Sequence, residues 1–138
     1  MALYQENLEI NTSPKSFLDI TKDVQTLVSE SGLDNGICNL FIRHTSASLV
    51  IQENYDPSVR KDFETFFSRL VPEDFPYVHN MEGKDDMPAH IRSAVTSTSE
   101  SIPIVNSKLS LGTWQGIYVW EHRDQRHIRK VTVSLIGD

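Results

Sequence analysis

Hydrophobic residues recur with two different periods along this chain, and the periods predict its elements. A spacing of three and four residues predicts helices over 20–31, with Asp19 as the cap, and over 57–70. The apolar stripe of the first helix contains Ile20, Val24, Leu27 and Val28. Alternation with a period of two predicts strands. The expected strands are 2–10, 37–44, 48–52, 101–105, about 109–121 and 128–136, and a short third helix is expected from Pro88 to about Thr96.

The second predicted helix has the clearest apolar stripe. Asp56 and Pro57 suit its cap and first turn. The residues at helical spacing, which are predicted to form a buried face, are Val59, Phe63, Phe66 and Leu70. Strands and helices follow one another without a regular βαβ rhythm. The order therefore predicts one compact α+β domain over residues 1–138, with a mixed or antiparallel sheet and helices packed on it.

Composition narrows the class of protein. The chain has 138 residues, of which 38% are hydrophobic and 23% charged, as in one globular domain. A net charge of −6 disfavours nucleic-acid binding, and the basic stretch 123–130 is interpreted as a solvated hairpin. No apolar run reaches the about 20 residues of a membrane span, and Cys38 is the only cysteine. We therefore expect a cytoplasmic protein without nucleic-acid or membrane partners.

The first candidate site lies where the predicted strand 37–44 ends. Alternation places His44 on the same face of that strand as Cys38, Leu40 and Ile42, so this apolar face finishes in an imidazole. Thr45 and Ser46 follow directly, and such small hydroxyl residues leave backbone N–H groups accessible to an anion. The alternative is an ordinary histidine at the edge of the core followed by turn hydroxyls, which is the commoner arrangement.

Two further histidines bracket the acidic segment YVHNMEGKDDMPAHI, residues 77–91. His90 is expected in the first turn of its helix, where a neutral, metal-binding imidazole is favoured and anions are attracted. The alternative is that His79 and His90 are exposed around a solvated loop, since their spacing matches no common zinc motif. Asp85 and Asp86 are interpreted as cap and first-turn charges of the same helix.

The segment LGTWQGIYVWEH, residues 111–122, carries two polar groups on an apolar strand face. Alternation puts Gln115 and Glu121 on the side of Ile117 and Val119. A carboxylate there needs a partner or a site. An ion pair across the hairpin, with Arg123 or Arg129, is an equal alternative. The opposite face is expected to be core or subunit interface, and it contains Trp114, Tyr118 and Trp120.

Three blocks of the sequence resemble the signature blocks of the YjbQ-like family, also called the secondary thiamine-phosphate synthase family. They are HTSASLVIQEN (44–54), YVHNMEGKDDMPAHI (77–91) and LGTWQGIYVWEHRD (111–124). The blocks occur in the family's order, and the resemblance extends from about Asp19 to the last strand. It implies a homotrimer with a site near subunit contacts, a weak thiamine-phosphate synthase activity and, in some relatives, a metal among the histidines.

The resemblance implies roles for individual residues. The groups expected in catalysis are His44, His90 and Glu121. Those expected to bind the substrate, a small phosphorylated molecule or anion, are Thr45, Ser46 and Gln115. A divalent metal, zinc or magnesium, is expected among His44, His79 and His90. A non-enzymatic metal- or ligand-binding protein using the same histidines is the alternative.

The sequence departs from the family pattern at two positions that are expected to lie in turns. Ser97 and Ser107 stand where the resemblance leads us to expect glycines, and a non-glycine residue pays for a positive φ. Few cations near the blocks are available to hold a leaving diphosphate, namely Arg43, Lys84 and Arg92. Glu121→Gln is expected to harm the site far more than the fold, because an exposed ion pair with an arginine across the hairpin would contribute only about 0–1 kcal/mol.

Overall fold

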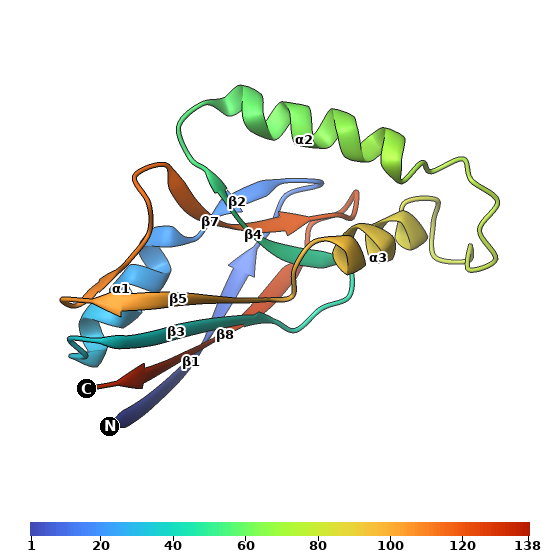
Figure 1. Cartoon of the computed structure of the whole chain (residues 1–138). Coiled ribbons are helices and arrows are strands. Elements are labelled where there is room, and N and C mark those ends of the chain that lie inside the picture. Colours follow the sequence, from blue (N-terminus) through green and yellow to red (C-terminus); the bar gives the residue numbers. More distant parts are fainter.

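The computed structural model describes all 138 residues and contains two sheets and three helices (Figure 1). The helices are α1 Thr21–Ser31, α2 Pro57–Leu70 and α3 Asp86–Val95. The strands are β1 Ala2–Asn11, β2 Phe17–Asp19, β3 Gly36–Ile42, β4 Ala47–Glu53, β5 Ser99–Val105, β6 Lys108–Leu109, β7 Gln115–Glu121 and β8 Ile128–Gly137. One sheet has the order β1-β8-β3-β5-β6 and the other β2-β7-β4. Every pairing is antiparallel, so the α+β prediction is confirmed in its antiparallel form.

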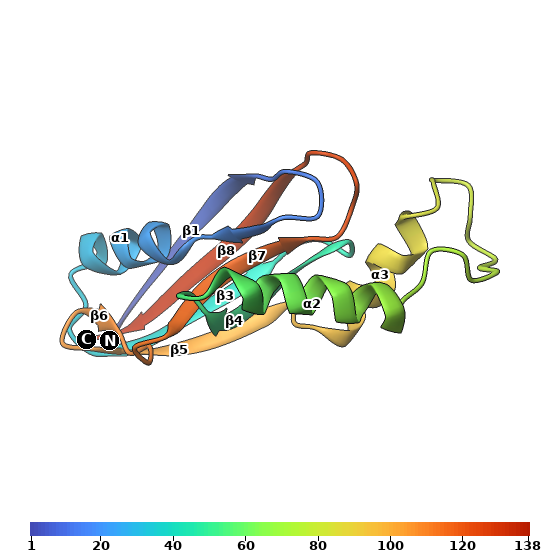
Figure 2. The ribbon, with the colours of Figure 1, turned by 90° about the horizontal axis from the view of Figure 1, so that it is seen from above.

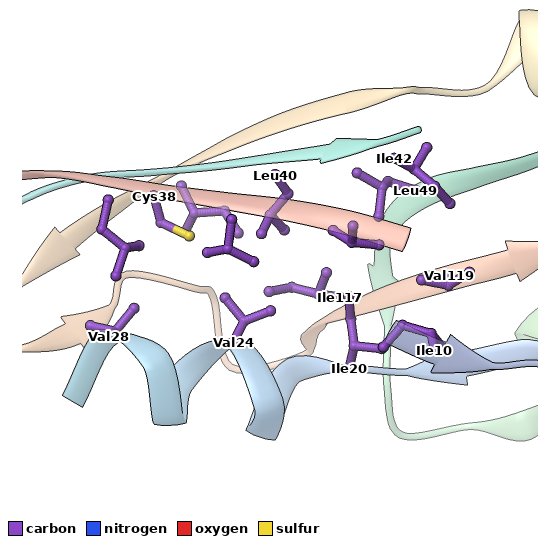
Figure 3. Close-up of a cluster of buried hydrophobic side chains, with 14 of the residues drawn as sticks. Ile10, Ile20, Val24, Val28, Cys38, Leu40, Ile42, Leu49, Ile117 and Val119 are labelled. Atoms are coloured by element: carbon purple, nitrogen blue, oxygen red, sulfur yellow. The ribbon is translucent and has the colours of Figure 1, made fainter. Parts of the chain in front are cut away.

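The hydrophobic core lies between the two sheets and α1 (Figure 3). Val24 and Val28 of α1 are fully buried there, as the helical spacing predicted. Gly32 ends this helix with a φ of 74°, a left-handed conformation that glycine adopts without strain. The cap differs from the prediction: the capping position is Ile20, and the Asp19 carboxylate accepts hydrogen bonds from the backbone and hydroxyl of Thr21 instead.

Helix α2 covers the other face of the three-stranded sheet (Figures 1 and 2). The rings of Phe63 and Phe67 lie 6.3 and 4.9 Å from the ring of Trp120. The prediction that α2 has a fully buried face is wrong, because Phe66 and Leu70 are 61% and 55% exposed. The helix touches the protein along one narrow stripe only, so the residues that flank this stripe remain in solvent.

The aromatic face of β7 is covered within the chain. Tyr118 and Trp120 are each 1% exposed, and Phe17 stacks on Trp120 at 4.3 Å. Trp114 precedes the strand, is 56% exposed and meets the edge of Tyr55 at 5.2 Å. Two of these three rings are therefore buried within the subunit itself, so burying them requires no second subunit. The homotrimer stays a prediction.

The predicted strand over about 109–121 is interrupted. Residues 110–114 form a connection in which the Gln115 side chain accepts a hydrogen bond from the Gly112 amide at 2.8 Å. The short strand β2 was not predicted, because three residues show no periodicity. Ser107 does adopt a positive φ, of 67°, and hydrogen bonds to the Asp34 backbone and carboxylate hold it, whereas Ser97 has no positive φ.

Helix α3 and the segment 71–85 project from one end of the molecule, away from the two chain termini (Figures 1 and 2). The amino group of Met1 lies 2.8 Å from the Asp138 carboxylate at the opposite end. None of the helices has the length and apolar character needed to cross a membrane. The projecting end carries one of the three sequence blocks, residues 77–91, with His79 and His90.

Candidate functional site

At the projecting end, three side chains point toward one another with atoms that could bind a metal ion. They are His79 from the segment before α3 and Asp86 and His90, which lie one helical turn apart on α3. Their ligand atoms all lie within 4.8 Å of one another. Asp86 Oδ2 is 3.0 Å from His79 Nε2 and 3.4 Å from His90 Nε2. The structure thus brings His79 and His90 together, with Asp86 as the third member.

The protonation of His90 follows from its hydrogen bonds. Its Nδ1 lies 3.0 Å from the backbone oxygen of Thr45, which can only accept, so Nδ1 carries the proton. In the neutral ring Nε2 therefore presents a lone pair toward the carboxylate of Asp86. Two electron-rich atoms 3.4 Å apart are placed so that one metal ion can bind both.

Arg123 holds the acidic residues at the start of α3. Its Nη1 donates to Asp86 Oδ1 at 2.9 Å and its Nε to Asp85 Oδ2 at 2.8 Å. Burial tends to raise the pKa of Asp85, but the hydrogen bonds from Arg123 and the Asp124 amide outweigh it and hold the pKa below its ordinary value. The cap interpretation is corrected for Asp85, whose side chain makes no cap hydrogen bond. Asp86 is 2% exposed and bonded to Arg123, so it is a buried carboxylate and not a solvated charge in the first turn of the helix.

A cavity of about 220 Å³ adjoins this cluster at His90. Its other lining residues include His44, Thr45 and Ser93. His44 Nε2 accepts the Lys130 amide at 2.8 Å, so the proton of the neutral ring is on Nδ1. Burial, and next the charge of Arg129, lower the pKa of His44, which favours the neutral form. His44 is therefore placed as a neutral N–H donor beside the cavity, outside the ligand group of Asp86.

Ser93 adds an unpaired hydroxyl to the same wall. Its side chain is buried, and its Oγ has no hydrogen-bond partner. It follows Asp86 and His90 at helical spacing on α3, so the three residues share a face of the helix. A buried polar atom without a partner costs free energy, and a ligand in the cavity would supply the partner once the side chain rotates toward it.

Glu121 belongs to a buried network rather than to this cavity. Its carboxylate is 0% exposed and accepts from Nε and Nη2 of Arg129, from the Thr12 hydroxyl at 2.6 Å and from the Arg123 amide at 3.1 Å. Burial tends to raise the pKa of Glu121, but these hydrogen bonds, Arg129 first, hold it below its ordinary value. Of the two alternatives for this residue, the structure shows the ion pair with Arg129.

The structure separates the remaining predicted residues from the cavity. The Ser46 hydroxyl accepts from Arg129 at 3.0 Å and is buried with it. Gln115 lies at the other end of β7 from Glu121, six residues or about 20 Å away along an extended strand. Of the predicted substrate-binding residues, Thr45 alone lines the cavity beside His90.

The site residues missed from the sequence have recognisable signals. Asp86 lies four residues before His90, which places both on one helical face, and Ser93 follows by three more. Arg123 had no local signal, because its partners lie 37 and 38 residues earlier. Spacing within α3 was sufficient to find the first two, whereas Arg123 required the fold.

One buried histidine, His122, was also missed. His122 is 1% exposed, its Nε2 lies 2.8 Å from Ser48 Oγ, and its Nδ1 has no partner. The Thr96 hydroxyl lies 2.7 Å from the Ser48 hydroxyl and 2.7 Å from the Arg92 backbone oxygen. Burial lowers the pKa of His122 to about 3, with the charge of Arg92 as the next cause. This imidazole is neutral and structural at neutral pH.

His122 is expected to make the folded state sensitive to acid. In the unfolded chain a histidine binds its proton near pH 6.5, whereas folded His122 binds one only near pH 3. Protons therefore favour unfolding, and stability falls as the pH falls from about 6.5 to 3, by up to about 1.4 kcal/mol per pH unit from this group. Urea unfolding across this range should show a shallower loss in His122→Gln than in the wild type. Parallel curves for the two proteins would contradict the assignment.

Comparison with known proteins places the chain among relatives along its whole length. The pattern of the family described as UPF0047 protein YjbQ-like matches residues 6–138. A UPF0047 protein of Synechocystis is 55% identical over 136 residues, covering 98% of this chain and 92% of its own. The UPF0047 protein YjbQ of Salmonella typhimurium is 40% identical, with 98% and 99% covered.

Solved structures agree with this relationship. A crystal structure from Sulfolobus solfataricus, described as a YbjQ-like protein of unknown function, superposes with a TM-score of 0.91 at 28% identity, covering 99% of both chains. An uncharacterized conserved protein of Clostridium acetobutylicum has a TM-score of 0.85 at 39% identity, with 96% and 99% covered. The family resemblance of the three sequence blocks is therefore confirmed, and the chain belongs to the YjbQ-like UPF0047 family, whose members named here have no stated activity.

Proposed function

We propose that this protein binds a divalent metal ion through His79, Asp86 and His90, and that the ion and the adjoining cavity together bind a small phosphorylated molecule. The observation that carries the proposal is the convergence of three ligand atoms within 4.8 Å. The hydrogen bond from His90 Nδ1 to Thr45 supports it, because metal-binding histidines typically donate their second nitrogen to such an acceptor.

The ligand set favours zinc over magnesium. Two imidazoles and one carboxylate suit zinc, whereas magnesium prefers oxygen ligands and retains its water. Zinc bonds of about 2.0–2.1 Å at tetrahedral angles separate neighbouring ligand atoms by roughly 3.3 Å. The separations from Asp86 Oδ2, 3.0 and 3.4 Å, are close to that spacing.

Three protein ligands leave a coordination position free, which is typical of a catalytic rather than a structural zinc site. His90 connects the cluster with the cavity, so the free position is expected on that side. The cavity wall offers the His44 N–H, Thr45 and the unpaired hydroxyl of Ser93, but no lysine or arginine. A phosphate there would depend on the metal ion for positive charge.

A group transfer with diphosphate as the leaving group is the reaction class that the family resemblance implies for this site. A bound divalent ion would supply the charge that stabilises the leaving oxygen atoms. His44 would donate a hydrogen bond from Nδ1. The other cations considered contribute little: Arg92 is buried and pairs with Glu64 at 3.1 Å, while Lys84 lines a separate cavity beside His79.

One observation favours a non-enzymatic alternative. Glu82 Oε2 lies 3.6 Å from His79 Nε2, and it would close the coordination sphere if it moved onto the ion. A site with four protein ligands is typical of structural zinc. Replacement of Glu82 with Gln distinguishes the two, because it weakens zinc binding only if Glu82 is a ligand.

Metal-dependent phosphate binding tests the proposal. Inorganic phosphate should bind to the zinc-loaded protein and not to the metal-free protein, as measured by calorimetry at fixed pH. Ser93→Ala should weaken phosphate binding, by about 5- to 10-fold for one lost hydrogen bond, while leaving zinc affinity unchanged. Phosphate binding of equal strength without the metal, or no zinc binding at all, would contradict the proposal.

Self-association stays a proposal from the family resemblance. The face of the five-stranded sheet that points away from the core carries exposed apolar residues, and no helix covers it in Figure 1. The exposed apolar residues on this face are Leu3, Ile37, Phe41, Val105, Ile128 and Ile136. A trimer should have three times the 15.7 kDa subunit mass in light scattering.

A further inference from the structure

Arg123 makes three hydrogen bonds with one planar group at the edge of the candidate metal cluster. Its Nη1 donates to Asp86 Oδ1 at 2.9 Å, its Nε to Asp85 Oδ2 at 2.8 Å and its Nη2 to the Glu82 backbone oxygen at 3.0 Å. The side chain is 14% exposed. The fixed fork of a guanidinium can hold all three acceptors at once, which the single ammonium group of a lysine cannot do.

Backbone hydrogen bonds of Arg123 and its neighbour Asp124 fix the position of this guanidinium. The Arg123 amide donates to Glu121 Oε2 at 3.1 Å, and Glu121 lies in the buried network with Arg129. The adjacent Asp124 amide donates to Asp85 Oδ2 at 2.9 Å. The start of α3 is therefore tied to the hairpin after β7 by side-chain and backbone bonds together.

These bonds decide which oxygen atoms face the histidines. Arg123 occupies Oδ1 of Asp86, which leaves Oδ2 for a ligand role beside His79 and His90. Arg123 and the Asp124 amide occupy Oδ2 of Asp85. Of the four oxygen atoms of these two carboxylates, one on each residue is thus engaged by hydrogen bonds, and Asp86 Oδ2 is the oxygen that lies within reach of both histidines.

We infer that Arg123 is the positioning residue that makes this site selective for zinc-like ions over calcium. The inference rests on the proposed metal function. Calcium takes six to eight oxygen ligands and uses carboxylates that bind through both oxygen atoms, whereas zinc takes four ligands and accepts nitrogen. By restricting Asp86 to one oxygen and withholding Asp85, Arg123 removes the oxygen-rich set that calcium needs.

The test compares zinc and calcium affinities in three variants, measured by competition with a chelator of known affinity. Arg123→Met should lower zinc affinity by about 10- to 100-fold, as for other residues that orient metal ligands. Calcium affinity should stay the same or rise, so the ratio of the two affinities falls. Arg123→Lys keeps a charge near Asp85 but not the fork, and its ratio should fall as well. Arg126→Met is the matched control from the same hairpin, because Arg126 is exposed and makes no ion pair.

The ratio separates a positioning role from a purely structural one, since a general loss of folded protein lowers both affinities together. Arg123→Lys keeps the test available if Arg123→Met does not fold. An unchanged ratio in the Arg123 variants, with zinc bound by the wild type, would overturn this inference alone. A wild type that binds no zinc would overturn the proposed function and the inference with it.

Discussion

Asp86→Asn is expected to abolish zinc binding at micromolar metal concentrations. The carboxylate is the one anionic member of the group formed with His79 and His90, and asparagine keeps its shape but not its charge. Loss of a residue that merely orients a ligand typically costs about 10- to 100-fold in affinity, so loss of a ligand itself should exceed this range. Competition titration against a zinc chelator measures the change.

Asp124→Asn is the control for this experiment. Its carboxylate belongs to the same corner of the molecule but faces Lys15 at 3.4 Å instead of the histidines. Zinc affinity in this variant should equal that of the wild type. If both variants lose affinity equally, the effect comes from surface charge, and Asp86 is not a ligand.

Glu121→Gln is expected to destabilise the folded protein by about 3–5 kcal/mol. The residue is fully buried and neutralises Arg129, which is itself 3% exposed, so the change leaves an uncompensated charge in the interior. This reverses the expectation from the sequence, where an exposed pair worth about 0–1 kcal/mol was assumed. Such a loss is a large part of the about 5–15 kcal/mol that stabilises a typical domain. Urea unfolding at neutral pH measures it.

Two companion variants make this result specific. Glu73→Gln removes an acid that pairs with Lys15 at 2.9 Å near the surface, and it should cost no more than about 1 kcal/mol. The double variant Glu121→Leu with Arg129→Met removes both charges and should be more stable than Glu121→Gln alone, because no buried charge remains unpaired. A single variant as stable as the wild type would show that Glu121 is not the counter-ion of Arg129.

Acid should reduce the contribution of the Glu121–Arg129 ion pair to stability. Since the pKa of Glu121 is below its ordinary value in the folded state, its contribution to stability is present above about pH 4.5. That contribution is lost as the pH falls through the folded pKa. The loss adds to that expected from His122, whose window lies between about pH 6.5 and 3.

Local periodicity was sufficient where one face of an element meets the core. Helix α1 buries Val24 and Val28, and β3 buries Cys38, Leu40 and Ile42, in both cases at the positions that spacing predicted. The start of α2 was also predicted, since the Asp56 carboxylate accepts the Ser58 amide and Pro57 begins the helix. Capping and alternation act between neighbours in the chain, so the sequence alone contains them.

Periodicity was insufficient where burial depends on what lies opposite. The stripe on α2 is real, but the three-stranded sheet reaches only the side of Phe63 and Phe67. The same holds for Glu121: its position at a strand end suggested exposure, yet Arg129 and the Thr12 hydroxyl enclose it. Both errors arise because exposure is a property of the whole fold and not of the segment.

The candidate site, too, was predictable in part from the sequence and depended in part on the fold. By itself the sequence determined the α+β class, the family and the histidines, because these follow from spacing and from short blocks. Only the tertiary structure decided that Asp86 rather than His44 stands beside His79 and His90, and that Arg123 directs its carboxylate. A ligand group needs atoms within a few ångströms, and residues 37 positions apart in the chain reach such distances only when the fold brings their elements together.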